Sequence, residues 1–121
     1  MDRFGSLLLF DTNGNPVPTG TLNVRAGEKV SFLVQLKGNQ VASTGPVKIE
    51  PTLTSDPSIA LAGGSQSTVN YGMLGAGFTG EKYRYIFNVP ESQKGKSGYV
   101  MIQLSEGSQA IHALQVLLNI Q

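Results

Sequence analysis

The most suggestive chemical motif is the glycine-rich stretch 75–80, which reads Gly-Ala-Gly-Phe-Thr-Gly. This spacing matches the loop that binds the pyrophosphate of a dinucleotide. Such a loop needs a helix directly after it, because the helix N-terminus holds the phosphates. Residues 81–89 alternate as a strand instead, so we predict a flexible hairpin loop, spanning 72–80, and no cofactor. If a ligand does bind this loop, the residues expected to contact it are Tyr71, Gly75, Gly77 and Phe78.

A second motif places oxygen-bearing side chains at alternate positions: Asp11, Asn13 and Asn15. A calcium-binding loop begins in this way, but its twelfth residue should be Glu, and here it is Leu22. Pro16 also stands where the glycine of the sharp turn belongs. An EF-hand is therefore excluded. We expect an Asn-Gly turn, with a looser calcium site formed by Asp11 and backbone carbonyls as the alternative.

Residues for nucleophilic or acid–base catalysis are sparse. His112 is the only histidine, and its sequence neighbours include no acidic residue. The chain has no cysteine, which removes a thiolate nucleophile, a cysteine zinc site and disulfides. The eight Asp and Glu residues include no close pair of the kind a glycosidase uses. We predict no catalytic or metal site, because an enzyme would need His112 to share a pocket with a carboxylate. The candidates for that carboxylate are Asp11, Asp56 and Glu106.

Charge and hydropathy exclude further classes. Nine Lys and Arg face eight Asp and Glu, and the basic residues are scattered without a run, so binding to nucleic acid is not supported. No apolar run approaches the roughly 18 residues of a membrane helix, and residues 1–4 do not resemble a signal peptide. Only 14% of the residues are charged. This composition favours an extracellular or cell-surface protein whose signal or anchor is not in this sequence, with a cytoplasmic protein as the alternative.

The elements that must position these residues are strands. Apolar and polar residues alternate over 28–37, 81–89, 99–104 and 114–120, as in half-buried antiparallel strands. Weaker strands are expected at 6–10, 21–24, 47–52, 58–62 and 67–74, each bounded by turn residues. A helix competes only over 109–121. There the apolar residues also alternate with period two, so we favour a terminal strand.

Frequent turns without helical periodicity indicate a sandwich or a barrel rather than an α/β fold. The 121 residues suit one domain. We therefore predict an all-β protein, an immunoglobulin-like antiparallel β-sandwich of about seven to nine strands that forms a single domain over residues 1–121.

Some strand positions that should be polar are apolar. One such residue occurs in each main strand: Leu33, Ile86, Met101 and Leu117. Contiguous exposed apolar patches usually mark contact surfaces, so these four predict an interaction surface. The alternatives are that a neighbouring loop covers them or that each is isolated. The chain has no tryptophan, and only Tyr71 and Tyr99 are plausible exposed ring platforms for a glycan.

The stretch 10–18, Phe-Asp-Thr-Asn-Gly-Asn-Pro-Val-Pro, resembles the opening of immunoglobulin-like domains in prokaryotic surface proteins. Residues 25–32 and 85–90 look like strand edges of such domains. The usual continuation of the first motif into a strand is delayed here by residues 19–27. The resemblance implies a spacer, an adhesive tip or an accessory module, and it supplies no catalytic residues.

These observations favour a non-enzymatic module for spacing, adhesion or protein assembly, whose partners are neighbouring domains or other subunits. One alternative is an accessory module that binds a glycan or peptide through the end loops 39–45 and 72–80. Another is a structural subunit that assembles by strand exchange, because the apolar residues 7–10 could complete a neighbour's sheet.

Overall fold

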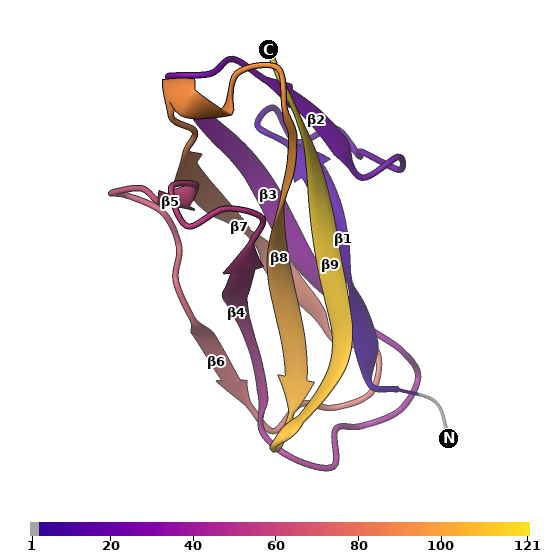
Figure 1. Cartoon of the computed structure of the whole chain (residues 1–121). Helices are drawn as coiled ribbons and strands as arrows, with labels where there is room; N and C mark the ends of the chain where they lie inside the picture. Colours follow the sequence, from indigo (N-terminus) through magenta and orange to yellow (C-terminus); the bar gives the residue numbers. More distant parts are fainter. Residues whose placement is uncertain (1–2) are drawn as a thin grey trace.

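The computed structural model describes residues 3–121, which form two β-sheets packed face to face (Figure 1). The strands are β1 (Gly5–Asp11), β2 (Thr21–Val24), β3 (Lys29–Gly38), β4 (Val47–Thr54), β5 (Ala60–Leu61), β6 (Val69–Gly72), β7 (Thr79–Asn88), β8 (Ser97–Glu106) and β9 (Gln109–Ile120). A single 3-10 turn, Glu91–Gln93, joins β7 to β8. The predicted immunoglobulin-like β-sandwich is confirmed, and its terminal segment is a strand, not a helix.

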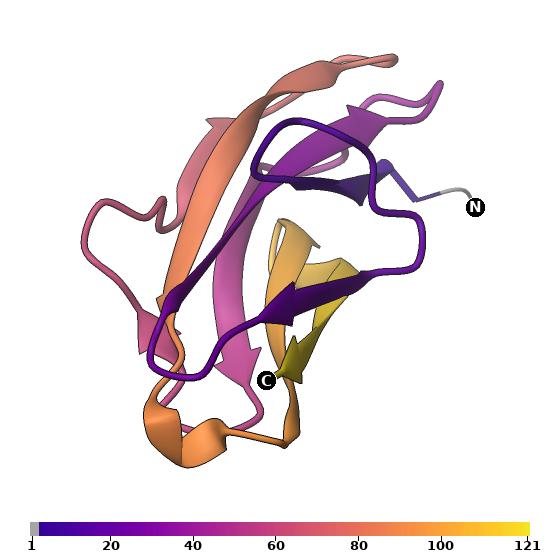
Figure 2. The same ribbon diagram turned by 90° about the horizontal axis from the view of Figure 1, so that it is seen from above.

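The smaller sheet has the strand order β1-β3-β7-β5, and the larger has β2-β9-β8-β4-β6. Every pairing is antiparallel except that of β2 with β9, which is parallel. The chain therefore changes sheets between β1 and β2, as the view from above shows (Figure 2). Within residues 3–121 no helix is long and apolar enough to cross a membrane.

The core between the sheets is built from the apolar residues that occupy every second position of the strands. On β3 the inward residues are Val30, Phe32, Val34 and Leu36, and each is at most 5% exposed. The Phe32 ring stacks on those of Tyr85 and Phe87, with centroids 6.1 Å apart in both pairs. Inward residues of the larger sheet meet this layer from the other side: Val47, Ile49, Val100, Ile102, Leu104, Val116, Leu118 and Ile120. Burial of this surface is the main stabilising contribution.

An irregularity in the pairing of β4 with β8 determines which residues face outward on the larger sheet. In the pairing of β4 with β8, Pro51 faces Ile102 but Leu53 faces Met101, so the ladder contains a bulge at Thr52. A bulge adds one residue to one strand and shifts its alternation. Leu53 consequently shares the outward face with Met101.

Candidate interaction face

The structure separates the four residues predicted to form one interaction surface. Leu33 and Ile86 lie on the outer side of the smaller sheet, on β3 and β7. Met101 and Leu117 lie on the outer side of the larger sheet, on β8 and β9. The expectation of one continuous row is therefore wrong. Period-two alternation distinguishes inward from outward positions, but it does not say to which sheet a strand belongs.

The pair on the smaller sheet is half-buried. Segment 62–66 runs along β7 beside Ile86: the Ala62 N–H donates to the Ile86 carbonyl at 2.8 Å, and the Ile86 N–H donates to Ser65 Oγ at 2.8 Å. Leu33 lies in register between Phe10 of β1 and Arg84 of β7. For Ile86, the alternative that a neighbouring loop covers the residue is therefore the correct one.

The pair on the larger sheet belongs to a wider patch. Met101 faces Leu53 of β4, and Leu117 faces Tyr99 of β8, so the register places four apolar residues on three strands. These strands, β4, β8 and β9, lie side by side (Figure 1). Leu53 is 52% exposed and Leu117 is 43% exposed, while Tyr99 and Met101 are half-buried. We call the residues Leu53, Tyr99, Met101 and Leu117 the apolar face. Sequence reasoning missed Leu53 because the bulge at Thr52 reverses its phase.

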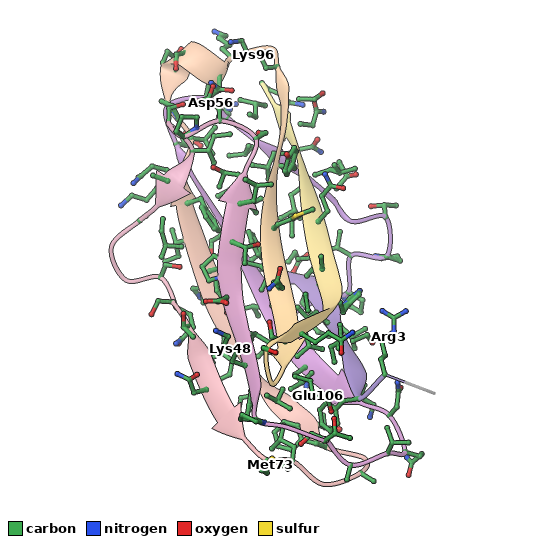
Figure 3. All side chains as sticks on the ribbon, turned by 60° about the horizontal axis from the view of Figure 1, so that its bottom comes forward. Arg3, Lys48, Asp56, Met73, Lys96 and Glu106 are labelled. Atoms are coloured by element: carbon green, nitrogen blue, oxygen red, sulfur yellow. The ribbon has the colours of Figure 1, made fainter. Side chains whose placement is uncertain are left out.

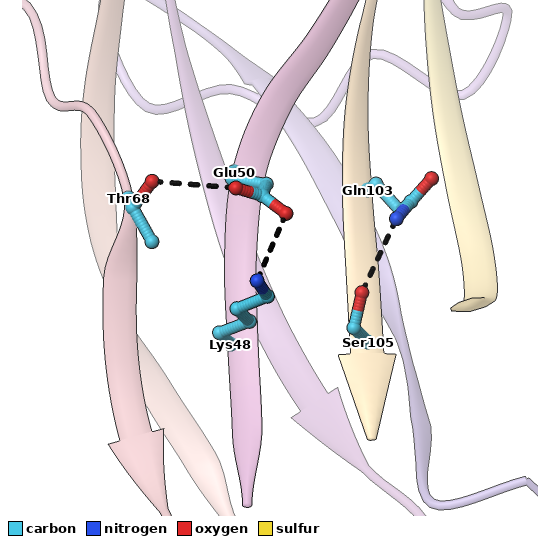
Figure 4. Close-up of polar contacts among 5 residues, drawn as sticks. All are labelled: Lys48, Glu50, Thr68, Gln103 and Ser105. Atoms are coloured by element: carbon cyan, nitrogen blue, oxygen red, sulfur yellow. Dashed lines mark hydrogen bonds and ion pairs between the residues drawn. The ribbon is translucent and has the colours of Figure 1, made fainter. Parts of the chain in front are cut away.

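Polar contacts border the apolar face along β4 and β8 (Figure 4). Lys48 Nζ lies 3.3 Å from Glu50 Oε1, and Thr68 Oγ1 donates to Glu50 Oε2 at 3.5 Å. Next to them, Gln103 Nε2 donates to Ser105 Oγ at 3.2 Å. An exposed ion pair of this kind contributes only about 0–1 kcal/mol. An apolar centre with a polar border is the usual anatomy of a protein interface.

The predicted loop site lies at one end of the sandwich, where Figure 3 labels Met73 and Glu106. The prediction of a hairpin is wrong, because β6 belongs to the larger sheet and β7 to the smaller one, so the loop crosses between the sheets. Hydrogen bonds join it to the loop after β3. The Gly77 N–H donates to the Asn39 carbonyl at 2.8 Å, and the Gly38 N–H donates to that of Phe78 at 2.6 Å. Gly75 is exposed. Gly77 has φ of +74°, a left-handed conformation that favours glycine.

Tyr71 is packed rather than presented as a platform. Its ring meets Phe78 edge-on at 5.5 Å between centroids and Tyr83 at 6.5 Å. Its hydroxyl is buried and has no hydrogen-bond partner among the described residues. Burial, with smaller effects of Tyr83 and Glu81, raises the pKa of Tyr71 to about 12. The tyrosine that is displayed on a sheet face is Tyr99.

The carboxylates considered for catalysis stabilise turns. Asp11 Oδ1 accepts hydrogen bonds of 2.9 Å from the backbone N–H groups of Asn15 and Asn13, and those bonds lower the pKa of Asp11. Asp56 Oδ1 accepts from the hydroxyl and the N–H of Ser58, which lowers the pKa of Asp56.

Glu106 Oε2 accepts from the Thr44 N–H at 2.7 Å, so it ties the loop after β3 to the end of β8. Figure 3 shows Asp56 and Glu106 at opposite ends of the sandwich. Among residues 3–121 no three His, Asp or Glu side chains are placed to hold a metal ion.

His112 is engaged with the backbone of β1. Its Nδ1 accepts a hydrogen bond of 2.9 Å from the Leu7 N–H. Partial burial lowers the pKa of His112, and the Arg3 charge lowers it further. None of the three candidate carboxylates is its partner, so the structure does not assemble the pocket that the enzyme alternative requires.

The described surface includes three hollows. A polar one of about 350 Å³ lies where β1 and β2 end and β3 begins, and it brings Asp11 and Glu28 near Arg25 and Lys29. An apolar one of about 390 Å³ lies between β1 and the connection to β2, and it is lined by Phe10, Pro16, Val17, Leu114 and their neighbours. A third, of about 300 Å³, lies between Thr21 of β2, Ser97 of β8 and Leu117 of β9. None of the three places His112 beside a carboxylate.

No family model matches the chain, and no curated protein matches it. Among solved structures, a family 123 glycoside hydrolase from Clostridium perfringens aligns with 98% of this chain at 9% identity and a TM-score of 0.52. The likeness is one of fold. The chain spans only 27% of that hydrolase chain. A chain from a dockerin–cohesin complex aligns over 97% of this chain and 99% of its own, at 9% identity and a TM-score of 0.38, which is too low to establish a shared fold.

Proposed function

We propose that this chain is a non-enzymatic module that acts in protein assembly, and that the apolar face binds the partner. The observation that carries the proposal is the contiguity of Leu53 with Met101 and of Tyr99 with Leu117 across three neighbouring strands. Exposed apolar patches with polar borders are typical of protein contact surfaces, and Tyr and Met are enriched in them. An extracellular or cell-surface location is part of the proposal and is supported by the low content of charged residues.

A protein partner is favoured over a glycan. Three of the four side chains on the apolar face are aliphatic or thioether chains, and Tyr99 supplies the single ring. Glycan binding at the end loops would need an open ring, whereas Tyr71 is packed against Phe78 and Tyr83. The end loops therefore offer little of the stacking surface that sugar recognition uses.

Strand exchange is not favoured by the position of β1. The whole strand pairs with β3 of its own chain, from Gly5 opposite Gly38 to Asp11 opposite Phe32. Leu7 and Leu9 are only 4% and 6% exposed and belong to the core. The segment that was considered as a donor strand thus completes its own sheet.

A second copy of the chain is the simplest partner, because most soluble oligomers are symmetric homo-oligomers. We expect association that depends on concentration in sedimentation velocity experiments on the wild-type chain. Replacing both Leu53 and Leu117 by Lys should weaken it at least tenfold, since two desolvated contacts are replaced by charges. The matched control is Met73→Lys, which adds a charge at a side chain that is 64% exposed but lies off the face.

The control should associate like the wild type. If the wild-type chain stays monomeric over the whole range, or if Met73→Lys weakens association as much as the double variant, assembly through the apolar face is refuted. Thermal unfolding of each variant checks that the fold is retained.

A further inference from the structure

The second exposed sheet face is basic, although the cations are scattered in the sequence. The register of β1, β3 and β7 places residues of equal phase in rows across the outer side of the smaller sheet. Those rows are Ser6-Lys37-Thr79, Leu8-Gln35-Lys82, Phe10-Leu33-Arg84, Ser31-Ile86 and Lys29-Asn88. They contain four exposed cations and no carboxylate. We call Lys29, Lys37, Lys82 and Arg84 the basic stripe.

Three of the four charges of the basic stripe, those of Lys37, Lys82 and Arg84, are positioned by neutral groups. Lys82 Nζ lies 4.1 Å from the centroid of the Phe10 ring, and Lys37 Nζ donates to Thr79 Oγ1 at 3.2 Å. The Arg84 guanidinium donates to Ser31 Oγ at 2.8 Å and to the carbonyl of Thr12 at 3.3 Å. Hydroxyls, a carbonyl and a ring orient these side chains without cancelling their charge.

Within the part of the chain that the structure describes, no carboxylate forms an ion pair with a side chain of the stripe. Among residues 3–121 the ion pair within 4.0 Å is that of Lys48 with Glu50, which lies on the other sheet. The acidic residues nearest to the stripe in sequence are Glu28, beside Lys29, and Glu81, beside Lys82. Neither forms an ion pair within 4.0 Å, although Glu28 lines the polar hollow together with Lys29. An unpaired, oriented row of cations raises the local concentration of anionic partners and speeds their association.

The spacing of the stripe indicates the form of the partner. Lys82 and Arg84 are two residues apart on one strand, which corresponds to about 7 Å. Alternate side chains of an extended peptide repeat at the same distance. Aliphatic side chains accompany the cations: Leu33 lies between Lys29 and Lys37 on β3, and Leu8, which is 40% exposed, lies on the neighbouring strand β1. Such side chains complement apolar residues of a peptide, but they have no counterpart in a sulfated sugar chain.

We propose that the basic stripe binds an extended acidic segment of a protein partner, with carboxylates at alternate positions that pair with Lys82 and Arg84. The stripe lies on the opposite side of the sandwich from the apolar face. One module thereby contacts two different partners at once, one through apolar side chains and one through charge.

The test uses a synthetic twelve-residue peptide with Glu at every second position and Val or Thr between. Its binding to the full chain is measured by fluorescence anisotropy at low and at high salt. Two further probes are a peptide of the same composition with its Glu residues in one block, and heparin. We expect the alternating peptide to bind most tightly, and its affinity to fall as salt rises, because exposed charges are screened.

The variant Lys82→Gln with Arg84→Gln should lower the peptide affinity about tenfold, since each exposed pair contributes about two- to fivefold. The matched control is Lys94→Gln with Lys96→Gln, which removes the same charge from a loop outside the stripe. A second variant, Lys29→Gln with Lys37→Gln, spares the contact with Phe10 and should weaken binding as well. The double variant Leu53→Lys with Leu117→Lys should lose no affinity for the peptide, which separates this proposal from assembly through the apolar face.

Equal losses in the Lys94 and Lys96 control would show that net charge alone attracts the peptide, and would overturn the proposal. Tighter binding of heparin than of the alternating peptide would assign the stripe to a glycan and overturn it as well. Absence of peptide binding at low salt would have the same consequence.

Discussion

The hydrogen bond between His112 and Leu7 predicts that stability falls as pH falls through the pKa of this histidine. Its Nδ1 accepts from the Leu7 N–H at 2.9 Å, which requires the neutral ring. Both nitrogens of a protonated ring are donors, so the Nδ1–H of His112 would point at the Leu7 N–H and the hydrogen bond would be lost. The bond fixes the middle of β1 to β9, and thus joins the two sheets at their seam.

The sign follows from linkage. Burial and Arg3 lower the pKa of His112 in the folded state, whereas the unfolded chain has the ordinary value of 6.5. The unfolded state therefore binds the proton first as the pH falls. The stabilisation is fully present above the unfolded pKa and is lost as the pH falls through the lower, folded pKa.

The magnitude is that of one partly exposed hydrogen bond. Such a bond contributes about 1 kcal/mol, and a buried N–H left without its acceptor costs about 1–3 kcal/mol. We expect His112→Ala to lose about 1 kcal/mol of unfolding free energy at pH 8, because water reaches part of this site. In His112→Asn, the side-chain oxygen takes a position near that of Nδ1 and does not titrate.

The assay is urea unfolding of the wild-type chain and of His112→Asn between about pH 8 and about pH 5. The wild type should lose stability over this range, and the Asn variant should lose clearly less. Asp11 and Asp56 do not confound the comparison. Their lowered pKa values, below the ordinary 3.8, place their own loss of stability at a lower pH. Parallel pH curves for the two proteins would refute the role given to this hydrogen bond.

Four further variants test the core and β1. Phe32→Ala should lose about 3–5 kcal/mol in urea unfolding, because the ring is fully buried between two other rings. Tyr71→Phe should leave stability unchanged or raise it by up to about 1 kcal/mol, because it removes a buried hydroxyl without a partner. In contrast, Tyr85→Phe should lose stability, since its hydroxyl donates to the Ser67 carbonyl. Deleting residues 1–10 should give an unfolded chain by circular dichroism, whereas a folded monomer would revive the strand-exchange alternative.

The strands could be predicted where the alternation of apolar and polar residues matches the alternation of buried and exposed positions. Alternation over 28–37 located β3 because each apolar residue of that segment at an even position is buried by both neighbouring strands and the facing sheet. The segment expected at 58–62 contains only the two-residue β5, with Ile59 buried just before it. This segment contains apolar residues because it covers one end of the core, and not because it forms a long strand in the sheet.

The candidate site was predictable only in part. Met101 and Leu117 were found from their phase on the strands, but Leu33 and Ile86 were assigned to the same surface because sheet membership depends on long-range pairing. Leu53 was missed because a bulge has no sequence signature as clear as alternation. The basic stripe could not be predicted from the sequence, because Lys37 and Lys82 share one face of the sheet only through the pairing of β3 with β7.

The position of β9 in the larger sheet affects when the chain can fold during its synthesis. This strand is the last in the sequence, yet it stands between β2 and β8 and pairs with both. During synthesis on the ribosome, the earlier strands emerge without the neighbour that β2 needs, and that strand's edge stays open until residues 117–120 have left the exit tunnel. Folding of this sandwich is therefore expected to be slow and to wait for β9, with the earlier strands exposed to aggregation in the interval.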